Sequence, residues 1–402
     1  MANILPTTSV VAKEMLAILQ NSRSFAKRVN RDYETEYTGS MSRGYEPGQT
    51  IAIKRPPRFT YRAGRVASPQ DTQMSTSFLT LSQGGTDLNF SSLDRTLNVA
   101  KFDKIMMAAA ATVMNEVDRQ GLDLARRTTL NSVGTPGTYP TTQALAYSLL
   151  TGANQKLDEM GCPLNDGRRS LIMNSAMNSA LLQGMGGLFN SAPAVSKGYT
   201  SGRFVDSFGF DVSIDQNVSR HTNGTQAIAS LTVNGASQVG SSLLVVATTG
   251  TITAGTTFTL GINAVNPQSR QDTGALQQFT VTSTVAAGAT TLPISPAILP
   301  TGAFQTVVSS PANGAVVTIL GTASGSYDAN IVFHEDAFTL AMVPMNQPSS
   351  GTGAKVTQLS DDGYTIKVTE VYDGVADNSI MRLDVLFGFA ATYPELACKI
   401  AA

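Results

Sequence analysis

Catalytic and metal-binding sites are usually built from histidine, cysteine and carboxylate side chains, and this chain of 402 residues offers few of them in a useful arrangement. Its only histidines are His221 and His334. His334 and Asp336 share one face of a predicted strand, which supplies at most two metal ligands, so a structural hydrogen bond is the favoured interpretation. Cys162 and Cys398 have neither ligand spacing nor a local histidine that could activate a thiol. The sequence therefore predicts no metal site.

Two glycine-rich segments faintly resemble phosphate-binding loops. Residues 184–187 lie inside or at the end of a predicted helix, and residues 351–355 lack both the Walker spacing and the Ser or Thr that follows its Lys. The adjacent acids at 158–159 and at 361–362 point to different faces, so neither pair can act as general acid and base. Turns and a helix end explain these segments better. We expect no catalytic residue, no cofactor and no enzymatic activity.

The strongest candidate for an interaction is a group of cations in one extended, proline-containing segment. The group consists of Lys54, Arg55, Arg58, Arg62 and Arg65. Such charge can simply protect a strand edge from aggregation, or it can bind nucleic acid phosphates or an acidic surface on a neighbouring copy. Residues 1–65 carry eleven Lys or Arg and five Asp or Glu, whereas residues 66–402 carry seventeen and twenty-four. This complementarity favours self-association over nucleic acid binding.

Charged side chains are scarce in the chain as a whole, at 14% against about 25% in a typical soluble domain. The deficit is concentrated between Thr222 and Tyr327, where Arg270 and Asp272 are the only charged side chains. Short β-branched runs recur there between Gly, Asn and Pro turns, which favours a small barrel or sandwich over a low-complexity segment. We therefore expect an inserted all-β domain over residues 222–329.

The chain shows no sign of export or of membrane insertion. Two cysteines in this length are not a disulfide framework and indicate a reducing compartment. No apolar run reaches the roughly 18 residues that a membrane span requires, and the N-terminus lacks the pattern of a signal peptide. A cytoplasmic product without a membrane partner is the expectation.

The cations follow a predicted N-terminal arm, residues 1–38. A helix is expected over Val10–Asn30, because this run contains no Gly or Pro and carries apolar residues at helical spacing. So close to the terminus, this helix is expected to dock on something other than its own chain. Residues 39–91 are predicted to be extended with little core of their own, since Pro56-Pro57 excludes a central sheet position.

A long helix is expected over residues 92 to about 131, where Ser91 and Asp94 have capping-box spacing. Its apolar stripe consists of Ile105, Ala109, Val113 and Val117. Helices at 142–160 and 174–189 are expected to flank a short strand at Leu171–Met173. After Asn330, strands return, and the apolar members of the last long one are Met381, Leu383, Val385, Phe387 and Phe389. Their alternation predicts a half-buried antiparallel sheet covered by the long helix, and hence an α+β fold.

This order of elements is similar to that of the major capsid proteins of tailed double-stranded DNA bacteriophages, the Hong Kong 97-type fold. The residues at 97–103, leading into a helix with Glu116-Val117-Asp118, resemble the spine helix of that family. Glu159-Met160-Gly161-Cys162-Pro163, with Leu171-Ile172-Met173-Asn174 beyond it, resembles the central segment. The residues at 330–341 resemble the beginning of the last third, and Tyr393-Pro394-Glu395-Leu396-Ala397-Cys398 resembles the C-terminal strand. A β-barrel inserted in the central domain resembles the coat proteins of short-tailed Salmonella-type phages.

The resemblance implies a structural major capsid protein that self-assembles, as hexamers and pentamers, into an icosahedral head around double-stranded DNA. The implied cofactor set is empty, and the implied location is the virion, with assembly in the host cytoplasm. The implied divisions are an N-terminal arm at 1–38, an extended loop at 39–91, a peripheral domain with the spine helix and part of the central domain at 92–140 and 330–402, a central domain at 141–221 and an inserted β-barrel at 222–329.

The resemblance also implies partners. The extended loop would reach over a neighbouring subunit, with the five cations of residues 54–65 meeting acidic surface there. A scaffolding protein and a portal are expected, DNA would be packaged non-specifically, and a decoration protein is possible. Two alternatives remain open at this point: a bacterial nanocompartment shell with the same fold, and a secreted glycan-binding protein whose Thr- and Gly-rich β-module is adhesive.

Overall fold

The computed structural model describes residues 24–32, 50–59, 61, 64–67, 69, 75–91, 102–163, 166–185, 201–204, 206–347, 354–361 and 364–402. The chain divides into two compact units. The first comprises Met1–Ile53, Ser77–Gly121 and Thr339–Ala390, and the second comprises Lys54–Thr76, Leu122–Phe338 and Ala391–Ala402. Among the described residues, no helix is both long and apolar enough to cross a membrane.

The first unit is built on an antiparallel sheet in the order β15 (Phe338–Met342), β18 (Asn378–Ala391), β17 (Tyr364–Asp373) and β16 (Lys355–Asp361). The strand β3 (Ser82–Ser91) also pairs with β18, along ten residues. The predicted alternation in β18 is confirmed for Met381, Leu383, Val385 and Phe387, which are buried, and for Arg382, which is half exposed. It is wrong at Asp384, which is buried and accepts a hydrogen bond from Arg382, and at Phe389, which is only partly buried. A strand with one buried face needs a covering layer.

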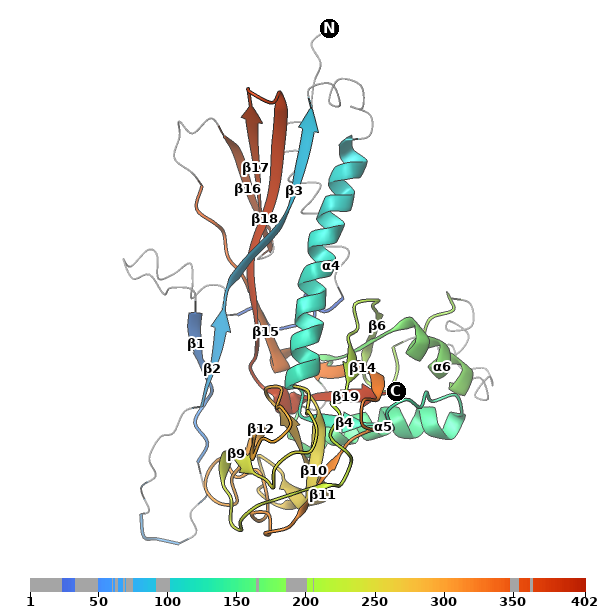
Figure 1. Ribbon diagram of the computed structural model, residues 1–402, viewed down its shortest axis with the longest axis vertical. Coiled ribbons are helices and arrows are strands. Elements are labelled where there is room, and N and C mark those ends of the chain that lie inside the picture. Colours follow the sequence, from blue (N-terminus) through green and yellow to red (C-terminus); the bar gives the residue numbers. More distant parts are fainter. Residues whose placement is uncertain are drawn as a thin grey trace. The chain divides into compact units, whose positions relative to one another are not determined.

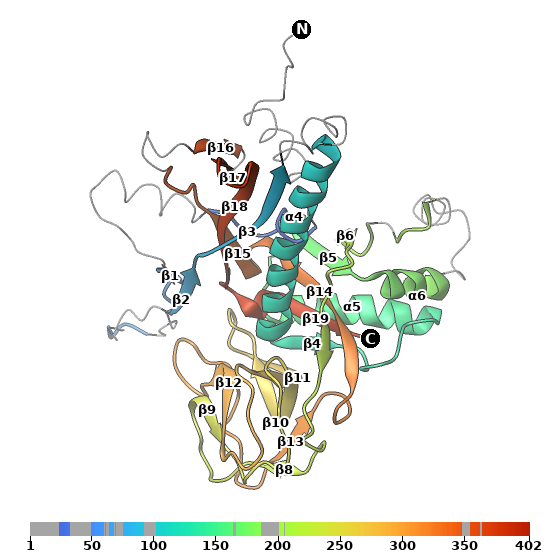
Figure 2. The ribbon, with the colours of Figure 1, turned by 45° about the horizontal axis from the view of Figure 1, so that its top comes forward.

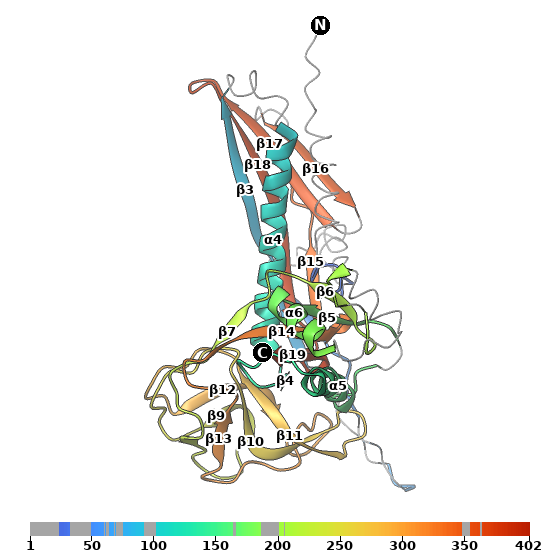
Figure 3. The same cartoon turned by 90° about the vertical axis from the view of Figure 1, so that its right-hand side faces the viewer.

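The long helix α4 (Phe102–Thr128) is that layer and runs along this sheet (Figure 1, Figure 3). Ala109, Val113 and Val117 are buried as predicted, but Ile105 is 39% exposed and does not belong to the stripe. A Cβ on Gly121 would lie only 2.6 Å from the Phe25 ring, which explains a glycine inside the helix. Ser91, half of the predicted capping box, is the last residue of β3, and Asp94, its other half, lies outside the described residues, so this cap stays a prediction.

The predicted helix over residues 10–30 is wrong in its described part. Residues 24–29 form turns and bends, and Asn30 forms a parallel bridge with Thr339. The buried carboxylate of Asp118 accepts hydrogen bonds from the Ser24 and Ala26 amides, both at 3.0 Å. These bonds replace the ones that a helix would make. Phe25 is fully buried within its own chain, so the expectation that this segment docks elsewhere is also wrong; residues 10–23 lie outside the described residues.

In its described part, the predicted extended segment begins and ends in strands. The strands β1 (Thr50–Lys54) and β2 (Thr76–Thr80) form a two-stranded sheet. Ile53 and Leu79 are buried in a cluster with Ala341 and other residues of the first unit. At this base the apolar side of a short ribbon packs on other residues of the first unit, which does not contradict the expectation that the segment has little core of its own. β3, at the end of the predicted loop, pairs with β18 of the antiparallel sheet.

The second unit contains a mixed sheet in the order β4 (Asn131–Val133), β19 (Ala397–Ala401), β14 (Ser326–His334), β5 (Arg169–Met173) and β6 (Asp211–Ile214). The helices α5 (Gln143–Glu159) and α6 (Ser175–Met185) pack against it through one core that includes Leu150, Leu181 and Val332. The predicted helices, and the strand between them, are confirmed. Residues 186–189 of the second predicted helix lie outside the described part of the chain.

The charge-poor segment forms a six-stranded sheet with its own apolar core (Figure 2). Its order is β8 (Leu231–Thr232), β13 (Val316–Ile319), β10 (Thr257–Val265), β11 (Asp272–Val281), β12 (Thr291–Ile298) and β9 (Gly240–Leu244). Just beyond β8 and β9, Val233 and Val245 form an antiparallel bridge, which joins the two edges and closes the sheet into a barrel. The all-β character of this segment is confirmed.

The chain enters and leaves the barrel through neighbouring strands. The incoming strand β7 (Arg220–Thr222) pairs with the outgoing β14, and Thr222 lies opposite Ser326. An insertion needs its two ends close together, as they are here. The limits of 222 and 329, and the other domain limits given above, remain predictions.

Candidate functional site

The five predicted cations do not form one cluster. Arg55 and Arg58 converge on a single carboxylate, that of Glu395, with nitrogen–oxygen distances of 3.4 and 3.7 Å. Lys54 and Arg65 are exposed and have no such partner in the described part of the chain, and Arg62 lies outside that part. The structure therefore brings two of the predicted residues together and adds a third, Glu395, that the sequence did not identify as an interacting residue.

Backbone constraints at the end of the β1–β2 ribbon position the two arginines. The Arg55 amide donates to the Ser75 carbonyl at 2.8 Å. Pro56 and Pro57 follow, and they have no backbone N–H to donate to a neighbouring strand, so the strand pairing ends there. Further along, the Arg270 guanidinium donates to the Phe59 carbonyl at 2.7 Å. Arg270, one of the two charged residues of the barrel segment, therefore fixes the backbone at Phe59.

Glu395 is held from the other side by a short 3-10 helix, η4 (Pro394–Leu396), which directly precedes β19. The side-chain amide of Asn131 donates to the carbonyls of Glu395 and Ala397, at 3.1 and 3.2 Å. The carboxylate is only 16% exposed and faces the two guanidinium groups. The sequence string Tyr-Pro-Glu-Leu could have suggested a fixed turn, but nothing in it indicates a partner 340 residues earlier.

Aromatic rings support both guanidinium groups. The Arg55 guanidinium lies over the Tyr393 ring, 5.1 Å from its centroid, and that of Arg58 lies over Phe304 at 5.7 Å. A cation over an aromatic face gains about 0.5–2 kcal/mol, depending on its exposure. Both the rings and the carboxylate of Glu395 therefore orient the guanidinium planes.

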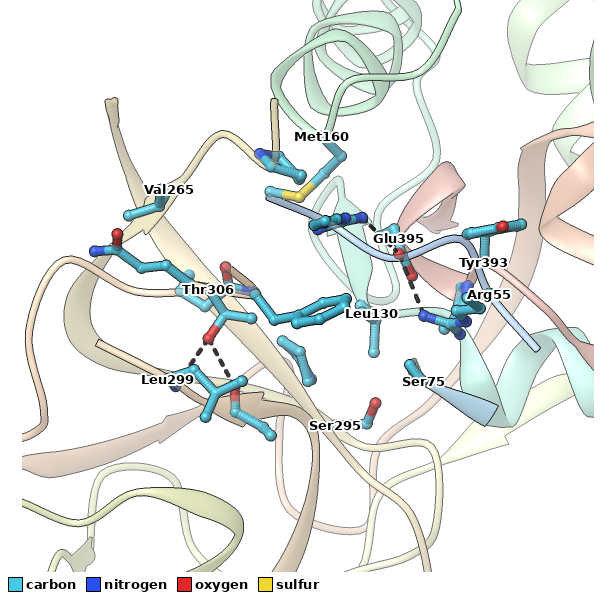
Figure 4. A pocket seen from close by; sticks show the side chains of 18 of the residues that line it. Arg55, Ser75, Leu130, Met160, Val265, Ser295, Leu299, Thr306, Tyr393 and Glu395 are labelled. Carbon is cyan, nitrogen blue, oxygen red and sulfur yellow. Dashed lines mark hydrogen bonds and ion pairs between the residues drawn. The ribbon is translucent and has the colours of Figure 1, made fainter. Parts of the chain in front are cut away.

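A cavity of about 450 Å³ lies beside this cluster (Figure 4). Apolar side chains, among them Leu130, Met160 and Leu299, make up much of its wall, and Arg55, Arg58 and Glu395 line it as well. The Thr306 hydroxyl is fixed in the wall by two backbone groups: it accepts a hydrogen bond from the Leu299 amide at 3.1 Å and donates one to the Ala297 carbonyl. The volume lies in the range of about 300–1,000 Å³ that is common for ligand sites.

A second group of ionisable residues is buried where β19 meets the end of α4. Lys399 is fully buried, and its ammonium donates to the carbonyls of Gly255 and Arg126 at 2.9 and 3.5 Å. Burial, aided by the charge of Arg126, lowers the pKa of Lys399 to about 7. Burial also lowers the pKa of His221 to about 3, with Lys399 and Arg126 adding to the effect. No sequence signal marked Lys399 as buried.

The other chemistry-bearing residues have structural surroundings. His334 shares a hydrogen bond of 2.6 Å with the carboxylate of Asp166 and accepts one from the Asp336 amide, so its predicted structural hydrogen bond is confirmed. Within the described residues, no three His, Cys, Asp or Glu side chains are arranged to hold a metal ion. Cys162 and Cys398 are free and buried, and burial raises the pKa of their thiols to about 11 and about 12.

Comparison with known proteins identifies the family. The model of the P22 coat protein family (P22 coat protein, gene protein 5) matches residues 5–399. No curated protein matches the chain. The match includes the barrel segment, on which the glycan-binding alternative depended.

Several of the solved structures that resemble this chain come from phages. One from Mycobacterium phage Che8 has a TM-score of 0.50 at 14% identity, covering 94% of this chain and 90% of that one. The capsid structure of the cyanophage P-SCSP1u has a TM-score of 0.43 at 12% identity, covering 88% and 84%. The mature capsid of bacteriophage PhiM1 has a TM-score of 0.43 at 8% identity, covering 88% and 82%. At these identities the first structure supports the fold alone.

With the family model matching nearly the whole length and the α+β fold agreeing with it, the chain belongs to the P22 coat protein family: it is a structural major capsid protein of tailed bacteriophages, not an enzyme, and its copies assemble into the icosahedral head of the virion.

Proposed function

We propose that, within this head, the extended loop of residues 39–91 binds a neighbouring subunit while the barrel stabilises its own. Exposed apolar side chains in the loop carry the first part of this proposal. Tyr61 is 95% exposed, Val66 is 84% exposed and Phe59 is 57% exposed. A short segment with this much uncovered apolar surface is suited to burial against a partner. Arg65 beside it supplies charge for an acidic partner surface.

Hydrogen bonds between uncharged groups support the second part of the proposal, that the barrel stabilises its own subunit. The Gln278 side chain accepts from the Ser132 amide and donates to the Ser132 carbonyl, and the Thr280 hydroxyl donates to the Thr129 carbonyl at 3.0 Å. The Asn266 side chain donates to the Glu159 carbonyl at 3.0 Å. These bonds connect the barrel to β4, to the residues after α4 and to α5. A barrel that docks through amides and hydroxyls needs few charged residues, which suits its composition.

Reversing loop charges tests the intersubunit role. The double variant Arg58→Glu/Arg62→Glu and the single variant Arg65→Glu should each fold but give fewer particles on sedimentation. Arg168→Glu is a matched control, because Arg168 is 59% exposed and pairs with Glu335 at 3.5 Å. Normal particle yield from Arg65→Glu, with the subunit folded by circular dichroism, would show that the loop charge is ordinary surface.

The remaining partners belong to the same proposal. We expect hexamers and pentamers of this chain, guided by a scaffolding protein and a portal, to enclose double-stranded DNA that is bound non-specifically. A decoration protein on the outer surface is possible in such a head. Extracting double-stranded DNA from purified mature particles would support the DNA assignment, and particles that contain only cargo protein would contradict it.

A further inference from the structure

The cluster around Glu395 is not balanced in charge. Two guanidinium groups share one carboxylate, and both distances, 3.4 and 3.7 Å, exceed the roughly 2.7–2.9 Å of strong charge-assisted hydrogen bonds. Other arginines of the chain reach such distances: Arg169 lies 2.6 Å from Asp158. Glu395 thus holds two cations through long contacts, and the cluster keeps one unit of positive charge.

One donor of the cluster has no acceptor among the described residues. Arg55 Nε is buried and makes no hydrogen bond to any described residue. Native structures rarely leave such a group unpaired, and each case needs an explanation. The Arg55 side chain is otherwise well fixed, by Glu395 and by the Tyr393 ring. The missing component is therefore an acceptor oxygen near a guanidinium that is already in position.

The cavity beside the cluster has room for the group that carries this oxygen. Arg55 and Arg58 line it, together with apolar side chains such as Leu130 and Leu299 (Figure 4). A ligand that fits has a negatively charged end for the arginines and an apolar stem for the wall. The side chain of Glu or Asp on an apolar segment of protein has this character.

We propose that this cavity is a socket for a carboxylate side chain from a second copy of the chain, which binds Arg55 and Arg58 when subunits assemble. The proposal deepens the intersubunit role of the loop and rests on it. In the isolated chain, Glu395 holds the two arginines in place for the incoming group. Assembly supplies copies of the same chain at close range, and residues 66–402 have an excess of seven acidic residues to provide the carboxylate.

Nucleic acid fits the cavity less well. A phosphate is strongly hydrated and carries no apolar stem, so it gains little from a wall with Leu130, Met160 and Leu299. DNA also contacts cations mainly at exposed surfaces, whereas Arg55 is only 20% exposed. The carboxylate of a second copy is therefore the better occupant, and DNA is an outcome that the test must distinguish.

Site-specific photo-crosslinking identifies the occupant. Phe304, which lines the cavity, is replaced by p-benzoylphenylalanine in the full chain, and isotope-labelled and unlabelled subunits are mixed before assembly. Irradiated particles should yield labelled–unlabelled peptide pairs that join Phe304 to one Asp- or Glu-containing segment, and unassembled subunits should yield none. Crosslinks confined to one subunit, or crosslinks to DNA, in assembled particles would overturn the socket.

The variant Arg55→Gln tests the socket quantitatively, through the concentration of free subunits. Loss of one charge-assisted contact per subunit should raise the equilibrium concentration of free subunits about tenfold and abolish the intersubunit crosslink. Arg119→Gln is the control, because Arg119 is 54% exposed and pairs with Glu116 on the same helix. Unchanged assembly in folded Arg55→Gln would overturn the socket. If Arg65→Glu reduces assembly while the Phe304 crosslinks stay within one subunit, the loop contact stands and the socket alone fails.

Discussion

Replacing Lys399 by Met should change the pH dependence of folding in a way that no surface lysine would. Lys399 lies in β19 and is fully buried, and its acceptors among the described residues are two carbonyl oxygens, those of Gly255 and Arg126. The positive charge of Arg126 lowers the pKa of the ammonium further, and the interaction with Cys398 raises it. Burial is the largest cause, and together they bring the pKa to about 7 from its usual 10.5.

The magnitude follows from linkage between protonation and folding. At about 1.4 kcal/mol per pKa unit, a fall from 10.5 to about 7 corresponds to a penalty of about 5 kcal/mol for the protonated form in the folded state. Below pH 7 both states carry the proton and the full penalty applies. Between pH 7 and 10.5 the folded state has lost the proton and the unfolded state has not. The free energy of unfolding should therefore rise with pH, by up to about 1.4 kcal/mol per pH unit.

Two other buried groups work in the opposite direction at higher pH. Burial raises the pKa of Cys162 to about 11 and that of Cys398 to about 12, so above the usual thiol value of 9.0 the unfolded state ionises first and folding weakens. A rising stability of the natural chain would therefore be partly hidden above pH 9. The difference between the natural chain and Lys399→Met isolates the lysine, because both proteins contain both cysteines.

The assay is urea unfolding of unassembled subunits at pH 6, 7, 8 and 9, with Lys355→Met as a control at an exposed lysine of β16. At pH 6, Lys399→Met should be more stable than the natural chain by a few kcal/mol, less than the full 5 because two carbonyls lose their donor. This advantage should shrink above pH 7 by up to about 1.4 kcal/mol per unit. A difference that is constant from pH 6 to 9 would refute the buried-charge account.

Three further outcomes are expected. Asp118→Asn should destabilise the subunit by about 1–3 kcal/mol in urea unfolding and speed proteolysis near Ser24, since the buried carboxylate binds two backbone amides there. Cys162 and Cys398 should react with a disulfide reagent only as fast as the subunit unfolds, because burial raises the pKa of both thiols; fast reaction of the folded chain would contradict this. Residues 222–329 expressed alone should give a dispersed amide spectrum of β type, because the barrel has its own core, and a collapsed spectrum would count against an independent domain.

The sequence was a good guide wherever one pattern dominates a segment. The alternation from Met381 to Phe387 predicted the buried face of β18, and the β-branched runs predicted the barrel strands. These patterns are local, because apolar residues at a regular spacing along one segment mark the face of that segment that is buried in the structure. The order of the elements, more than any single motif, indicated the family.

The sequence failed where a distant residue decides the local structure. Residues 24–30 have helical periodicity, but the carboxylate of Asp118, far along the chain, binds their amides in a non-helical conformation. The pairing of Arg55 with Glu395 spans 340 residues and leaves no local signal. Lys399 sits in a strand that is covered on both faces, so its neighbours show no alternation that would mark it as buried.

The most direct test of the account is sedimentation, with electron microscopy of the fractions, of the purified chain assembled in the presence of its scaffolding protein. We expect closed icosahedral shells as the main product and particle loss when Arg65 is replaced by Glu. A stable 42.2 kDa monomer with scaffold present and no large particles would contradict it.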